Sequence, residues 1–128
     1  MGPSKAFAVL ILVAAAYAFA SGQQSDAGLG GGYTCHGTDI GGGAYEGTLD
    51  VRQAGPTYQL KWTVSGRELI GVGLPTNNGM AASFSDFQTV VGLVVFVSKG
   101  GELAGQWTAI GAGGVSTETC RKGSGARA

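Results

Sequence analysis

The chain has 128 residues, a formal net charge of zero and 25 glycines. Its length suits one small domain, and its glycine content suits a fold with many tight turns. Residues 33–120 hold seven acidic and four basic side chains. This mildly acidic stretch lacks the basic face on which nucleic-acid binding depends, so nucleic-acid partners are disfavoured.

The first 20 residues have the pattern of a secretory signal peptide. Lys5 precedes the apolar run AFAVLILVAAAYAF, which ends in the small-residue cleavage site Ala18-Phe19-Ala20. The run is shorter than the roughly 18 apolar residues of a membrane anchor. We therefore expect export, to the periplasm or out of the cell, and no transmembrane segment in the mature protein.

The segments on either side of the patterned region are expected to be flexible. Residues 21–32 (SGQQSDAGLGGG) are polar and rich in glycine, and residues 121–128 (RKGSGARA) are small and basic. The folded domain is therefore expected over residues 33–120, between a flexible leader and a disordered basic tail.

Two cysteines, Cys35 and Cys120, lie at the two edges of this domain. In an exported chain such a pair is typical of a disulfide that joins the first strand to the last. Reactive redox cysteines more often occur as a Cys-x-x-Cys pair, which is absent here. A structural disulfide is therefore the preferred interpretation.

Alternation of apolar and polar residues predicts strands and no helix. Residues 44–53 (AYEGTLDVRQ) and 57–64 (TYQLKWTV) alternate with period two, and the turn residues between them predict a hairpin. Further strands are expected at residues 33–38, 67–74, 80–85, 90–97, 102–108 and 114–120. About eight strands with short connections predict an all-β fold, an antiparallel up-and-down meander closed into a small avidin- or lipocalin-like barrel, with a β-sandwich as the alternative.

Two further patterns bear on packing. Glycines within the expected strands indicate bends or close backbone approaches, at Gly47, Gly71, Gly73, Gly92 and Gly105. Residues 90–97 (VVGLVVFV) are apolar on both faces of their strand. A loop or a partner is expected to cover the outer face.

Four aromatic residues form the candidate ligand-binding set: Tyr45, Tyr58, Trp62 and Trp107. All four are expected to point into the barrel. Eight-stranded barrels can hold one small molecule, so the rings either line a ligand cup or simply fill the core.

The sequence offers no catalytic, metal or cofactor motif. His36 is the only histidine, which argues against both a zinc site and a catalytic base. The glycine runs at residues 30–32, 41–43 and 100–101 are not followed by Lys-Ser or Lys-Thr, so no phosphate-binding loop is expected. We therefore expect a non-enzymatic protein without a metal or cofactor.

Several segments together resemble a group of small exported bacterial proteins, some of which are labelled fibronectin-binding proteins. The segments are Gly37-Thr38-Asp39, Tyr45-Glu46-Gly47-Thr48, Tyr58-Gln59-Leu60-Lys61-Trp62, Gly71-Val72-Gly73, Gly92-Leu93-Val94-Val95-Phe96, residues 101–108 (GELAGQWT) and Thr117-Glu118. The resemblance covers nearly all of the expected domain. The chain departs from the group in carrying Cys35 and Cys120, and it lacks an avidin-type biotin-site pattern.

Three functions follow as hypotheses. The first, which the resemblance implies, is a secreted or periplasmic protein that binds a host or envelope macromolecule such as fibronectin. The second is an inhibitor of an extracytoplasmic protease or lysozyme, with the leader at residues 21–32 entering an active site. The third is a carrier of a small ligand in the barrel lumen.

Overall fold

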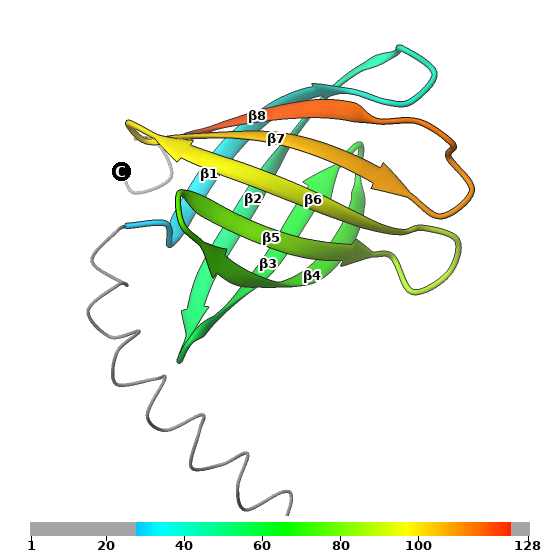
Figure 1. Ribbon diagram of the computed structural model, residues 1–128. Helices are drawn as coiled ribbons and strands as arrows, with labels where there is room; N and C mark the ends of the chain where they lie inside the picture. The colour runs from blue at the N-terminus through cyan, green and yellow to red at the C-terminus, as the bar shows by residue number, and fades with distance from the viewer. Residues whose placement is uncertain (1–27, 124–128) are drawn as a thin grey trace, which may run out of the picture.

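The computed structural model describes residues 28–123 and contains eight strands and no helix in that range (Figure 1). No helix in this described part is long and apolar enough to span a membrane. The strands are β1 (Gly31–Thr38), β2 (Ala44–Ala54), β3 (Thr57–Val64), β4 (Arg67–Thr76), β5 (Gly79–Ser85), β6 (Val91–Lys99), β7 (Glu102–Ala109) and β8 (Ser116–Lys122).

Each strand pairs antiparallel with the next, and β1 pairs with β8, so the sheet closes into a barrel. The predicted up-and-down barrel is confirmed, and the sandwich alternative is wrong. Alternation explains the closure, because every strand has one apolar face that only a shared interior can bury. The closed sheet leaves no exposed strand edge.

The strands extend slightly beyond the expected domain. β1 begins at Gly31, within the segment expected to be a flexible leader, and Leu29 before it is buried. β8 continues to Lys122, whose ammonium group donates a hydrogen bond to the backbone carbonyl of Gly28. The proposed signal peptide, most of the leader and residues 124–128 lie outside the described residues.

The disulfide closes the seam of the barrel. Cys35 on β1 lies directly opposite Cys120 on β8, and their sulfur atoms are bonded. Both side chains are fully buried, so the bond belongs to the interior. A disulfide is compatible with an oxidising, extracytoplasmic location.

One half of the barrel is filled. The strand directions place the connections at residues 55–56, 77–78 and 100–101 at one end, shown on the left of Figure 1. The largest fully buried side chains are Phe96, Leu49, Met80, Leu103 and the two cysteines. Gly105 leaves room for the largest of them, because a Cβ there would lie 2.7 Å from the Phe96 ring. This half is a close-packed core.

The outer side of β6 is exposed, although the apolar pattern on both faces of residues 90–97 led us to expect a loop or a partner over it. Val91, Leu93, Val95 and Val97 point outward while Gly92, Val94 and Phe96 point inward. Leu93 is 62% exposed, and no described residue covers it. Val72 and Leu74 on β4 are exposed as well, on the far side of β5 from β6.

Candidate functional site

The other half of the barrel contains a cavity of about 390 Å³. It lies at the end that carries the connections at residues 39–43, 65–66, 86–90 and 110–115, on the right of Figure 1. Exposed residues at this end, including Asp39, Ser65 and Arg67, belong to the lining, so the cavity opens to solvent there. Its volume falls in the range of small-molecule sites.

Three aromatic rings form a wall of the cavity. Phe84 on β5 packs edge-on against Trp62 on β3 and Trp107 on β7, with ring centroids 5.9 Å apart in each pair. The planes cross at 69° and 80°, so the rings meet the cavity at different angles. Gly92 on β6 permits this arrangement, because a Cβ at that position would collide with the Phe84 ring.

A buried carboxylate forms the floor of the cavity. Glu118 on β8 is 5% exposed, and β8 runs from Ser116 near the opening to Cys120 in the filled half. Tyr45 donates a hydrogen bond of 2.6 Å to Glu118 Oε1, and the Trp62 indole donates one of 3.0 Å to Oε2. The carboxylate therefore ties β8 to β2 and β3 across the lumen.

Gly37 makes the Tyr45 contact possible. In the sheet it lies opposite both Tyr45 on β2 and Glu118 on β8. A Cβ on Gly37 would lie 2.5 Å from the Tyr45 hydroxyl oxygen and 2.7 Å from a β8 carbonyl oxygen. The missing side chain leaves the path along which the tyrosine crosses β1 to reach Glu118.

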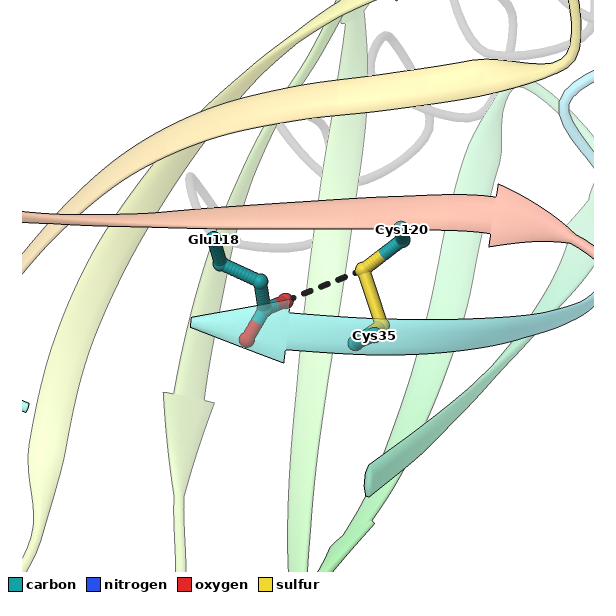
Figure 2. Close-up of side chains that lie close together, drawn as sticks. All are labelled: Cys35, Glu118 and Cys120. Atoms are coloured by element: carbon teal, nitrogen blue, oxygen red, sulfur yellow. Dashed lines mark hydrogen bonds between the residues drawn. A yellow bond between two sulfur atoms is a disulfide. The ribbon is translucent and has the colours of Figure 1, made fainter. Parts of the chain in front are cut away.

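The environment of Glu118 favours its protonated form. Burial raises the pKa of Glu118 above its ordinary value, although the hydrogen bonds from Tyr45 and Trp62 oppose that shift. Burial and then the charge of Glu118 raise the pKa of Tyr45 as well, so the phenol stays a donor. Figure 2 shows the carboxyl group beside the disulfide, with Oε2 3.2 Å from Cys120 Sγ. Because a disulfide sulfur has no proton, only a protonated Glu118 can make this contact a hydrogen bond.

Trp107 contributes a donor without a well-formed hydrogen bond. Its Nε1 atom is buried close enough to Tyr45 to oppose the rise in the pKa of the phenol, yet no acceptor within residues 28–123 lies in good hydrogen-bonding geometry with it. A buried indole N–H without an acceptor is unfavourable. An acceptor atom of a bound molecule would remove that cost.

The opening is organised by Asp86 in the connection between β5 and β6. Asp86 Oδ1 accepts hydrogen bonds from the backbone N–H groups of Gln88, Thr89 and Val90. Its Oδ2 accepts one of 2.6 Å from Arg67 on β4. These bonds hold the pKa of Asp86 well below its ordinary value, so the aspartate stays charged and its connection stays attached to β4.

The four candidate ligand-binding residues separate in the structure. Tyr45, Trp62 and Trp107 line the cavity, whereas Tyr58 is buried at the filled end of β3. Sequence reasoning missed Glu118 and Phe84 as cavity residues. For Glu118 the usable signal was alternation, because the residue two positions before an inward cysteine also points inward.

Two other groups of side chains add no metal or catalytic chemistry to this site. His36 is exposed on the outer side of β1, 3.3 Å from Glu46. Cys35, Glu118 and Cys120 lie close enough together to be considered as metal ligands. The disulfide uses both sulfur atoms, so this group offers no thiolate to a metal.

No protein-family model matches this chain, and no curated protein matches it. The resemblance to small exported bacterial proteins therefore stays a prediction.

Proposed function

We propose that the protein binds a small molecule in the open half of its barrel. The observation that carries this proposal is the 390 Å³ cavity floored by the buried carboxyl group of Glu118. A barrel that served only as a scaffold would gain stability by filling this space with side chains. The aromatic wall and a few convergent polar groups are the usual composition of a ligand site.

The polar groups supply both kinds of hydrogen-bonding function. Glu118 presents carboxyl oxygens at the floor, and Trp107 presents an N–H donor without a partner among residues 28–123. The rings of Trp62 and Phe84 together provide apolar contact area for a ligand. This combination supports a ligand with an apolar body and at least two polar atoms.

A thermal-shift screen of small molecules tests the proposal, with tryptophan fluorescence as a second readout. A ligand present at 100 times its Kd stabilises the folded state by about 2.7 kcal/mol. We expect hits that shift the melting temperature and change the emission of Trp62 and Trp107. A screen without a single saturable hit would contradict the proposal.

A plugged variant provides the matched control. Ala109 on β7 lines the cavity, and Ala104 on the same strand points outward. We expect Ala109→Phe to abolish ligand binding and Ala104→Phe to preserve it. Equal binding by the two variants would place the ligand outside the barrel.

The other two functional hypotheses remain predictions. Binding of a macromolecule such as fibronectin would use the outer surface, and enzyme inhibition would use a leader that lies mostly outside the described residues. Export likewise remains a proposal, with which the disulfide is compatible.

A further inference from the structure

The charged side chains around the cavity differ in sign and in their distance from the opening. Its charged lining consists of Glu118, Asp39 and Arg67. Glu118 lies at the floor, whereas Arg67 lies at the opening, is 58% exposed and pairs with Asp86. Asp86 thus neutralises the charge of Arg67, which is the one cationic side chain of this lining. A ligand that reaches the floor meets a carboxyl group, which favours a cation over an anion.

The walls also favour a particular kind of cation. Trp62, Phe84 and Trp107 line the same space as Glu118, with rings that meet at steep angles. The face of an aromatic ring attracts a positive charge, and indole does so most strongly. An alkylated ammonium group loses less hydration on entering an apolar space than a primary ammonium group does. Aromatic walls above a buried carboxyl group therefore suit an alkylated cation.

We propose that the barrel lumen binds an alkylated ammonium compound, with the charged nitrogen against Glu118 and the aromatic wall and an oxygen acceptor at Trp107 Nε1. This inference rests on the proposed function of the lumen as a small-molecule site. It specifies the ligand by charge and by one acceptor atom. The binding energy comes from the carboxylate, from the ring faces and from the hydrogen bond that Trp107 gains.

The proton on Glu118 competes with the cation. When the carboxyl group ionises, its negative charge becomes available to the ligand, so affinity is expected to rise with pH. The other titratable groups around the lumen are Tyr45 on β2, Asp39 and the Arg67–Asp86 pair at the opening. Tyr45 stays neutral and Asp86 stays charged over the neutral range, because their pKa values are shifted up and down respectively.

A pair of esters with the same shape tests the inference. Acetylcholine carries a quaternary nitrogen, and 3,3-dimethylbutyl acetate has a carbon atom at the same position. We expect the wild-type protein to bind acetylcholine about tenfold or more tightly than the neutral ester, as measured by calorimetry and tryptophan fluorescence. We expect this preference to increase with pH.

Two variants locate the source of the preference. Glu118→Gln is expected to lower the ratio of the two affinities, leaving only the part of the preference that the ring faces supply. Glu46→Gln, which removes an exposed carboxylate outside the cavity, is expected to retain the full preference. Circular dichroism checks that both variants fold. If the wild-type protein binds the two esters equally, the cation inference is wrong while the lumen remains a ligand site. If neither ester binds, the inference is wrong, and a screen without hits would remove the proposed function as well.

Discussion

The two halves of the barrel are built from the same eight strands but packed in opposite ways. In the half that holds Phe96, Leu49 and Met80, fully buried side chains occupy the interior. In the other half, Trp62, Phe84 and Trp107 stand around a space of about 390 Å³. Glu118 lies at the boundary, in contact with the disulfide on one side and the cavity on the other. The comparison predicts that stability comes mainly from the filled half, where the largest fully buried side chains lie.

Removing the disulfide is expected to have the largest effect on stability, because the bond joins the first and last strands of the barrel covalently. Cys35 and Cys120 are 85 positions apart in sequence. A crosslink over such a loop stabilises a folded chain by about 4 to 5 kcal/mol in the chain-entropy account. We expect reduction, or replacement of both cysteines by alanine, to lower the melting temperature markedly in calorimetry. An unchanged melting temperature would mean that the bond is absent in solution.

Substitution of one phenylalanine in each half compares the stability that the two halves contribute. Phe96 has no exposed surface in the filled half, so Phe96→Ala should leave a closed void and cost about 3 to 5 kcal/mol. Phe84 borders space that is already open, so Phe84→Ala should cost only the transfer of its ring, about 1.5 to 3 kcal/mol. Urea unfolding measures both values. Equal costs would show that the open half contributes as much stability as the filled half.

Gly37→Ala tests the tyrosine that reaches the floor. Its Cβ would overlap the Tyr45 hydroxyl, so we expect a loss of about 1 to 3 kcal/mol from overpacking and rupture of the bond to Glu118. Gly30→Ala is the control, because the atom nearest to its added Cβ is 3.6 Å away. Urea unfolding of both variants provides the comparison, and a neutral Gly37→Ala would mean that Tyr45 does not cross β1.

The smallest expected effect is the pH dependence that Glu118 causes. Its pKa is raised in the folded state above the ordinary value of 4.5, so the folded protein holds a proton that the unfolded chain has released. Stability from this group is therefore complete below pH 4.5 and is lost as pH rises through the folded-state pKa, by at most about 1.4 kcal/mol per pH unit.

Glu118→Gln should remove this slope. The measurement is the difference in unfolding free energy between wild type and variant at a series of pH values. Asp86 cannot account for a slope above pH 4.5, because its pKa is lowered and its contribution is lost only below its ordinary value of 3.8. Parallel curves for the two proteins would show that Glu118 has an ordinary pKa.

The sequence predicted the barrel well because each strand carries its own evidence. Alternation in residues 57–64 and the turn residues on either side define β3 without reference to any other strand. Closure of the sheet followed from the number of strands and their short connections. The disulfide between Cys35 and Cys120 was predictable because the pair brackets the strands.

The site was only partly predictable, because its composition depends on which side chains face one another across the lumen. Tyr58 and Trp62 share the inward face of β3, yet only Trp62 borders the cavity. Alternation assigns a face but not a depth, and depth decides which ring meets empty space. Glu118 was missed because a carboxylate is ordinarily solvated. Its burial depends on donors from β2 and β3, and no local pattern in residues 114–120 indicates them.

The bond between Cys35 and Cys120 also bears on how the protein withstands proteases. Every connection between strands lies between these two residues in the sequence. A single cut in any connection therefore yields two fragments that remain joined through sulfur. Such a nicked barrel would run as one species on a non-reducing gel and as two on a reducing gel. The loops around the opening can thus be cleaved once without release of either part of the chain.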